Sequence, residues 1–181
     1  MLFLSKFIIS TNMQQPEWST LGPQICQLAR AAGNAILRIY QDSADTSALV
    51  AHKSDDSPLT LADLAAHQVL AEGLARLTPQ IPVVSEEDAG SFVHRTAPGC
   101  FWLIDPLDGT KEFLARNGEF TVNIALVEGA RPVLGVVQFS EEMRRPSDGV
   151  GLPGPGTVLH EVLRPGAVGQ HRRLQLAGVQ A

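Results

Sequence analysis

Cysteine is scarce in this sequence: Cys26 and Cys100 are the two among 181 residues, and neither belongs to a CxxC pair. This scarcity excludes a disulfide scaffold, argues against a zinc site and is typical of a reducing compartment. We interpret both as buried small hydrophobic residues. Positive charge is also in deficit, since 14 Lys and Arg face 19 Asp and Glu for a formal net charge of -5. Nucleic acid is therefore excluded as a partner, and a small molecule fits better.

Long hydrophobic runs are absent as well. The apolar start, MLFLSKFIIS, is interrupted by Lys6 and precedes no small-residue cleavage pattern, so it is too short to cross a bilayer and unsuited to a signal peptide. We interpret residues 1–19 as an N-terminal tail, with Met13 as an alternative start. We expect a cytoplasmic protein, and peripheral contact with the inner membrane stays open.

Two stretches show helical spacing of apolar residues. The first predicts an amphipathic helix over residues 20–39, capped by Ser19 or Thr20. After a polar loop, the second predicts a helix over residues 61–77 with Thr60 as its cap. The packing face of this second helix would comprise Ala66, Leu70, Leu74 and Leu77.

Short apolar runs typical of strands follow the helices. They cover residues 81–85 and 101–104, and then a hairpin whose strands are residues 120–126 and 133–139 around a turn at residues 128–131. The order predicts an α+β domain over residues 20–139, in which two helices pack on a mostly antiparallel sheet.

Residues 140–181 differ in character from the rest. From residue 141 onward there are seven Gly, four Pro, five Arg and no Lys, without a sustained helical or strand period. We predict an irregular tail rather than a folded domain. A native linker or tail is one account; translation of GC-rich DNA in a shifted reading frame is another, and the composition favours the second.

Acidic residues stand where two of the predicted strands end. Ser85-Glu86-Glu87-Asp88 follows one strand, and Asp105-Pro106-Leu107-Asp108-Gly109-Thr110 follows the next. Because Pro106 fixes the backbone, Asp105, Asp108 and the Leu107 carbonyl can converge on one cation. Oxygen ligands select magnesium or manganese over zinc. Taken singly, each acidic group is more often a solvated loop or turn, but the two together indicate a metal site.

The residues after the second acidic group suit a phosphate. Gly109 lets the backbone approach a ligand closely, and Thr110 opens a predicted helix whose free N–H groups favour an anion. Two metal ions about 4 Å apart with a phosphate between them are a standard arrangement for phosphoryl transfer to water. His52, His67 and His94 show no metal-binding spacing, and we interpret them as surface or loop histidines.

The string WLIDPLDGTKEF, from Trp102 to Phe113, resembles the signature of the inositol monophosphatase superfamily. The segments QICQLARAAGNAILRIY, DDSPLTLAD, VVSEED and ARNGEFTVNIALVEGARPVLGVV are similar to the 3'(2'),5'-bisphosphate nucleotidase branch, so the likeness covers roughly residues 24–137. Inositol monophosphatases typically carry DGTTNF at the place where this sequence has DGTKEF, and this difference resembles the nucleotidase branch. The resemblance implies the N-terminal half of a layered α/β/α/β/α sugar-phosphatase fold.

The resemblance also implies a ligand set for two magnesium ions. Glu86, Asp105 and the carbonyl of Leu107 would bind one ion, and Asp105 with Asp108 would bind the second. Glu86 would help to hold a third, weaker ion. Such a site would hydrolyse the 3'-phosphate of adenosine 3',5'-bisphosphate to AMP and phosphate.

The remaining roles concern water and phosphate. By resemblance, Asp63 and Thr110 would orient and deprotonate the attacking water, which makes them the catalytic residues. Gly109 and Thr110 would hold the transferring phosphate. The substrate would be contacted, directly or through the metal ions, by Glu86, Leu107, Asp108, Gly109 and Thr110.

One departure from the family pattern limits these expectations. Family members carry a later Trp-Asp-x-x-Ala-Gly-like element whose aspartate completes the second metal site, and we find no such element here. Asp148 is the only aspartate after Asp108, and we do not accept it as a substitute because it lies in the unpatterned tail. We therefore expect a missing C-terminal domain, negligible turnover by this chain alone and self-association through exposed surface, with no obligate protein partner. A non-catalytic fragment and an inositol or sugar phosphatase remain the alternatives.

Overall fold

The computed structural model describes residues 15–42, 50–52, 58–96, 99–139, 158–162 and 175–176. In chain order the helices are α1 (Gln15–Asp42), α2 (Leu61–Leu77), the 3-10 helix η2 (Ala89–Thr96) and α3 (Thr110–Leu114). The strands are β1 (Val50–His52), β2 (Pro58–Thr60), β3 (Val83–Ser85), β4 (Cys100–Asp108), β5 (Thr121–Glu128), β6 (Arg131–Phe139), β7 (Val158–Val162) and β8 (Gln175–Leu176).

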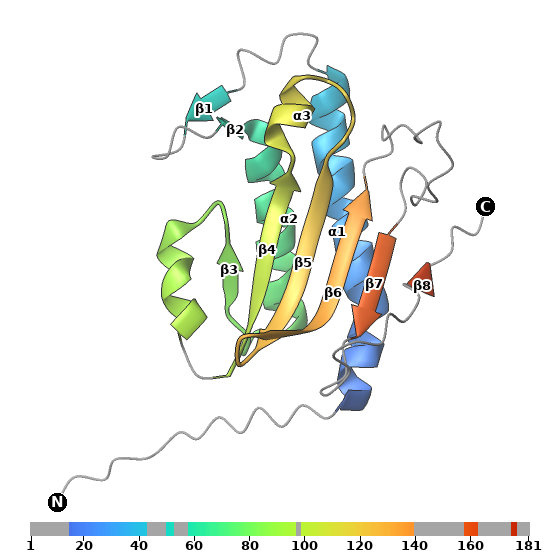
Figure 1. The fold of residues 1–181 in the computed structure, drawn as a ribbon, viewed down its shortest axis with the longest axis vertical. Helices are drawn as coiled ribbons and strands as arrows, with labels where there is room; N and C mark the ends of the chain where they lie inside the picture. The colour runs from blue at the N-terminus through green and yellow to red at the C-terminus, as the bar shows by residue number, and fades with distance from the viewer. Residues whose placement is uncertain are drawn as a thin grey trace, which may run out of the picture.

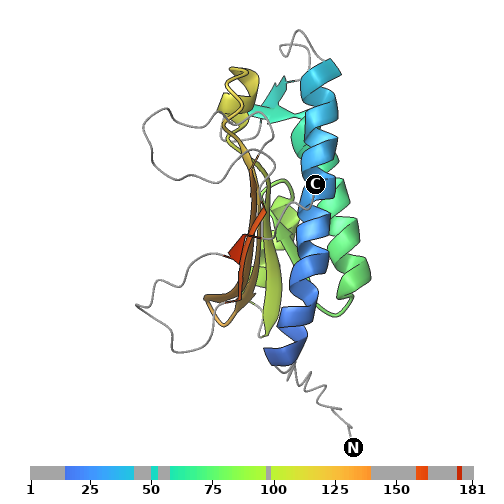
Figure 2. The ribbon, with the colours of Figure 1, turned by 90° about the vertical axis from the view of Figure 1, so that its right-hand side faces the viewer.

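A six-stranded sheet in the order β3-β4-β5-β6-β7-β8 is backed on one face by α1 and α2 (Figures 1 and 2). The β3–β4 pair is parallel and the other pairs are antiparallel. The predicted α+β class and the mostly antiparallel sheet are confirmed. None of the described helices is long and apolar enough to span a bilayer.

The core lies between the sheet and the two helices. Along β4, β5 and β6, alternate side chains turn toward the helices, as period-two strands require. The buried set on this face includes Trp102, Ile104, Val122, Ile124, Leu126, Leu134 and Val136. It meets Ile25, Ala29, Ala32 and Ile36 of α1 and Ala66, Leu70 and Leu74 of α2. Both cysteines are buried as predicted.

Several predicted boundaries need correction. The first helix begins at Gln15, so Ser19 and Thr20 lie inside it rather than at its cap, and residues 15–19 are not tail. Pro16 suits a first turn, because a helix leaves the first amides unpaired in any case, and Pro23 forgoes one hydrogen bond within the helix. The second helix runs over residues 61–77 as predicted, but Leu77 is 37% exposed and does not pack.

The segment after residue 139 contributes more than the predicted irregular tail. Strand β7 pairs with β6, and β8 pairs with β7. Such pairing depends on partners distant in the sequence, which composition does not reveal. The prediction of a shifted reading frame is not tested by these two strands, and most of residues 140–181, like residues 1–14, lies outside the described ranges.

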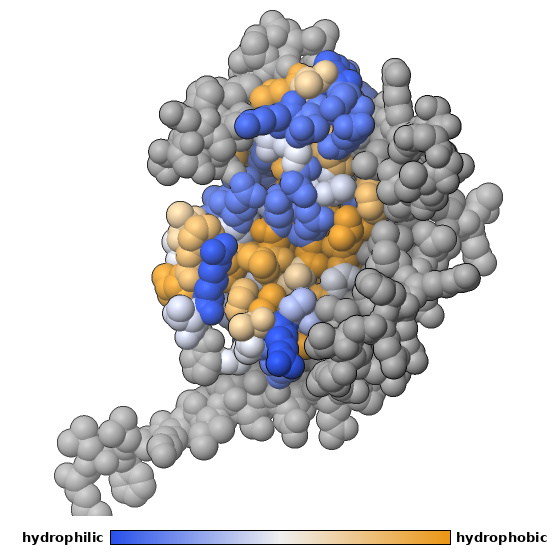
Figure 3. Space-filling model, in the orientation of Figure 1, coloured by the Kyte–Doolittle hydropathy of each residue, from blue (hydrophilic) through white to orange (hydrophobic). Residues whose placement is uncertain are grey.

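The opposite face of the sheet is open over the described residues. Figure 3 shows a hydrophobic patch in the middle of this face. A cleft of ≈ 390 Å³ lies there, and its lining includes Leu103, Ala125, Gly135 and Val137 together with the acidic residues Glu86 and Asp105. Leu103 is 36% exposed. Apolar surface of this kind favours association.

We expect the chain to self-associate through this open face, and Leu103→Lys to weaken the association by placing a charge on the patch. Leu77→Lys is the matched control, since Leu77 is equally exposed at 37% but lies on α2. Sedimentation velocity over a concentration series checks this. A monomeric wild-type chain at every concentration, or equal effects of the two substitutions, would contradict it.

Candidate metal and phosphate site

The parallel pairing of β3 with β4 brings two acidic residues together. Ser85 is in register with Ile104, and the Glu86 amide donates to the Ile104 carbonyl at 3.2 Å. Parallel strands end at the same edge of a sheet, so the next residues, Glu86 and Asp105, lie side by side. The negative charge of Glu86 therefore acts directly on the Asp105 carboxyl group.

A bulge in β4 puts Asp105 and Asp108 on the same face. Residues three apart in a regular strand point to opposite faces. Here Asp105 pairs with Asn123 and Asp108 pairs with Thr121, so three steps along β4 match two along β5. The extra residue realigns the side chains. The Asn123 amide Nδ2 consequently donates to Asp108 Oδ2 at 3.0 Å.

Asp105 is the electrostatic centre of this group. Burial and the negative charges of Glu86 and Asp108 raise the pKa of the Asp105 carboxyl to about 7. Its Oδ1 atom is buried and has no hydrogen-bond partner. A half-buried carboxylate in such surroundings is stabilised by a proton or by a cation.

These residues are chemically suited to a divalent metal ion, but they do not surround one as they stand. The donors are oxygen atoms, which suit magnesium, and the unpaired Asp105 Oδ1 is an available ligand atom. Within the described ranges, however, no three His, Cys, Asp or Glu side chains are gathered closely enough to hold an ion. Asp108, bonded to Asn123, would have to turn toward Asp105 to complete the set.

Asp63 lies at the start of α2 and is fully buried. A capping box fixes it: the Thr60 amide and hydroxyl donate to Asp63 Oδ2 at 2.7 and 2.5 Å, while Thr60 Oγ1 accepts from the Asp63 amide. Burial raises the pKa of Asp63, and hydrogen bonds from Thr60 and Thr110 act in the opposite direction. The Oδ1 atom is left to face the site.

Thr110 supplies the partner of that free oxygen. Its Oγ1 lies 3.2 Å from Asp63 Oδ1 and 3.2 Å from the Leu107 carbonyl oxygen. One hydroxyl hydrogen serves these two acceptors in turn. The structure therefore brings Asp63, Thr110 and Leu107 together, as the sequence interpretation requires.

Gly109 and an aromatic cluster hold Thr110 in place. Gly109 has φ 95°, and a Cβ atom there would lie 2.9 Å from the Glu119 carbonyl oxygen, so a side chain is excluded by both strain and space. Behind α3, the rings of Tyr40, Phe113 and Phe120 pack with centroids 5.2 to 5.6 Å apart. Phe113 thus anchors the short helix that Thr110 begins.

Two residues near the site were not predicted from the sequence. Asn123 holds Asp108, and its position opposite Asp105 follows from strand register, which the sequence does not show. His67 was interpreted as a surface or loop histidine, and this is wrong: it is half-buried on α2, with Nδ1 2.8 Å from Ser85 Oγ. Its signal in the sequence is its place four residues after Asp63, on the same helical face.

Comparisons with known proteins identify the family to which the chain belongs. The model of the inositol monophosphatase family matches residues 17–148, and the chain belongs to that family. It is 59% identical over 114 residues to the 3'(2'),5'-bisphosphate nucleotidase CysQ of Salmonella typhimurium. The matched segment covers 63% of this chain and 46% of that protein. The chain therefore spans about half the length of the curated relatives it matches.

Solved structures show the same relationship. The crystal structure of CysQ from Bacteroides thetaiotaomicron, a bacterial member of the inositol monophosphatase family, has a TM-score of 0.58 at 37% identity, covering 79% of this chain and 46% of that one. The suhB protein of Bartonella henselae has a TM-score of 0.63 at 20% identity, covering 87% and 52%, and shows the shared fold.

We predict that Asp105→Asn stabilises the metal-free chain at pH 8 by on the order of 1 to 2 kcal/mol, discounted for partial solvent screening. With a folded pKa of about 7 against an ordinary 3.8, the wild-type carboxyl favours folding below pH 4, and this stability is lost as pH rises toward 7. The advantage of the variant should therefore be small at pH 5. Thermal melts in EDTA check this.

Added magnesium should reverse the order, because an ion that binds the folded wild-type chain raises its melting temperature. The Asn variant, lacking one ligand charge, should gain less. If the variant is less stable than wild type at pH 8 in EDTA, the ionised Asp105 carboxylate does not destabilise the folded chain and the prediction is wrong.

Proposed function

We propose that this chain supplies the metal-binding and water-activating part of a magnesium-dependent phosphatase. The proposed reaction is hydrolysis of the 3'-phosphate of adenosine 3',5'-bisphosphate to AMP and phosphate. The observation that carries the proposal is the Asp105 carboxylate, crowded by Glu86 and Asp108 and with one oxygen unpaired. The similarity to proteins named 3'(2'),5'-bisphosphate nucleotidase supports the choice of substrate.

In this proposal, two magnesium ions are held by Glu86, Asp105, Asp108 and the Leu107 carbonyl, with a third, weaker ion near Glu86. Bound magnesium would neutralise phosphate charge and acidify a water molecule. Asn123 keeps the Asp108 side chain on the face of the sheet that Asp105 occupies. The protein thus assembles negative charge that a substrate phosphate could not approach without cations.

The Asp63–Thr110 pair would orient the attacking water. While the Thr110 hydroxyl donates to Asp63 Oδ1, its lone pairs can accept a hydrogen bond from the water, so that as the water proton passes to Thr110 the hydroxyl proton passes to Asp63. Because Thr60 occupies Asp63 Oδ2, the carboxylate cannot rotate away. Burial raises the pKa of Asp63, which makes it a better proton acceptor.

The phosphate would lie against Gly109 and Thr110. The left-handed conformation of Gly109 turns the chain from β4 into α3 and excludes a Cβ atom. With no side chain on Gly109, the backbone can come close to a phosphate oxygen. The Thr110 hydroxyl would lie between the phosphate and Asp63.

A second candidate function is metal binding without turnover. It is favoured by the ligand set in the described part of the chain, which is incomplete as long as Asp108 stays bonded to Asn123. Accordingly, we propose that residues 1–181 alone release phosphate at a negligible rate and that catalysis needs a further carboxylate.

A chimera separates these alternatives. We predict that the Salmonella typhimurium protein, with its matched segment replaced by the 114 matching residues of this chain, releases phosphate from adenosine 3',5'-bisphosphate with magnesium. Asp105→Asn in the chimera should lower kcat well over a hundredfold, since even outer-shell changes at metal sites cost about 10- to 100-fold. A colorimetric phosphate assay gives the rates.

The substitution Gln68→Leu, on the outer face of α2, is the control in the same chimera. A folded chimera that is inactive with magnesium would overturn the proposed reaction. Turnover by the unmodified 181-residue chain at the rate of the Salmonella typhimurium protein would overturn the proposal that catalysis needs a further carboxylate.

A further inference from the structure

Helix α2 contacts the site at two points one helical turn apart. Asp63 binds Thr110, and His67, four residues later, reaches Ser85 at the end of β3 with its Nδ1 2.8 Å from Ser85 Oγ. Residues four apart share a helical face, so both side chains point toward the same edge of the sheet. The function proposed above uses Asp63 and leaves His67 without a role.

Ser85 is the first residue of the turn that carries Glu86. Its hydroxyl oxygen accepts from the Glu87 amide at 3.2 Å, and its own amide donates to Ser91 Oγ at 3.1 Å. The Asp88 amide closes the turn on the Ser85 carbonyl at 3.1 Å. Glu86 is therefore held between two residues that both depend on Ser85.

The Ser85 side chain is 1% exposed, so its hydroxyl cannot exchange its protein partners for bulk water. The bond to His67 holds the Ser85 Oγ atom in place, and the same oxygen accepts from the Glu87 amide. A buried hydroxyl without the imidazole would be left with an unmade bond. Loss of His67 should thus loosen the turn beside the exposed Glu86 carboxylate rather than the core.

We propose that His67 is a positioning residue for the metal site: through Ser85 it fixes the turn that aims Glu86 at Asp105. The role rests on the proposed function, because it concerns a metal ligand assigned there. By the same contact, α2 sets the distance between the Asp63–Thr110 pair and the Glu86–Asp105 pair.

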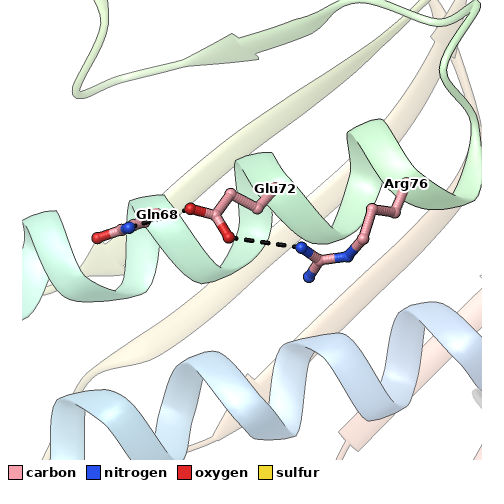
Figure 4. Close-up of polar contacts among 3 residues, drawn as sticks. All are labelled: Gln68, Glu72 and Arg76. Atoms are coloured by element: carbon pink, nitrogen blue, oxygen red, sulfur yellow. Dashed lines mark hydrogen bonds and ion pairs between the residues drawn. The ribbon is translucent and has the colours of Figure 1, made fainter.

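Three substitutions in the full chain test this role. His67→Leu removes the hydrogen bond, whereas His67→Asn keeps a polar atom at the place of Nδ1. Gln68→Leu is the matched control: Figure 4 shows Gln68 in a polar row with Glu72 and Arg76 along α2, and the Gln68–Glu72 bond is exposed. Manganese binding is measured by the loss of the free-ion signal in electron paramagnetic resonance.

We expect His67→Leu to weaken manganese binding about tenfold, the lower range for outer-shell partners of metal ligands. His67→Asn and Gln68→Leu should bind like wild type. Rescue by Asn is the outcome that a merely space-filling role for the imidazole would not give. Equal affinity in wild type and His67→Leu, or equal loss in Leu and Asn, would overturn the inference.

Amide hydrogen exchange in the metal-free chain provides a second readout. His67→Leu should speed exchange at Glu86 and Glu87 while α2 amides stay protected, and unchanged exchange would overturn the role of His67 without any metal. Ser85→Ala removes the same bond from the other side, so its effect should not add to that of His67→Leu. A wild-type chain that binds no manganese would instead overturn the proposed function.

Discussion

The crowding of carboxylates where β3 and β4 end is the constraint on which the rest of the structure depends. Parallel pairing fixes Glu86 beside Asp105, and the bulge turns Asp108 to the same face. The result is a raised pKa for Asp105, about 7, and a buried oxygen without a partner. The repulsion among these carboxylates destabilises the folded chain at neutral pH, and this cost is understandable if the carboxylates bind cations.

The elements around this site hold it against that repulsion. The capping box fixes Asp63, the aromatic cluster of Tyr40, Phe113 and Phe120 supports α3, and α2 packs on the buried face of β4. None of these contacts neutralises the carboxylates. They keep the negative groups in position, which is what preorganised metal sites require.

Local signals account for what the sequence predicted well. Thr60 and Asp63 form a capping box within four residues, and the start of α2 at Leu61 was predicted correctly. The alternation of Val122, Ile124 and Leu126 likewise defined β5 and its buried face. The turn at residues 128–131 is confirmed, with Gly129 and Ala130 at positive φ.

Features that depend on register were not predictable. The bulge between Asp105 and Asp108 depends on how β4 pairs with β5, and the bond from Asn123 follows from it. His67 gains its partner only when α2 packs beside β3. Strands β7 and β8 form on an edge that β6 provides. The ligand and catalytic roles of Glu86, Asp105, Leu107, Asp108, Asp63 and Thr110 remain predictions that the geometry supports.

The most direct measurement is calorimetric titration of the chain with manganese at several pH values, in two buffers of different ionisation enthalpy. The account predicts proton release on binding at pH 6, approaching one proton per ion because Asp105 is largely protonated there, and falling toward none above pH 8. Asp105→Asn should release no such proton. Binding with no proton release at any pH, or no binding at all, would contradict the proposal that a metal ion displaces the proton of Asp105.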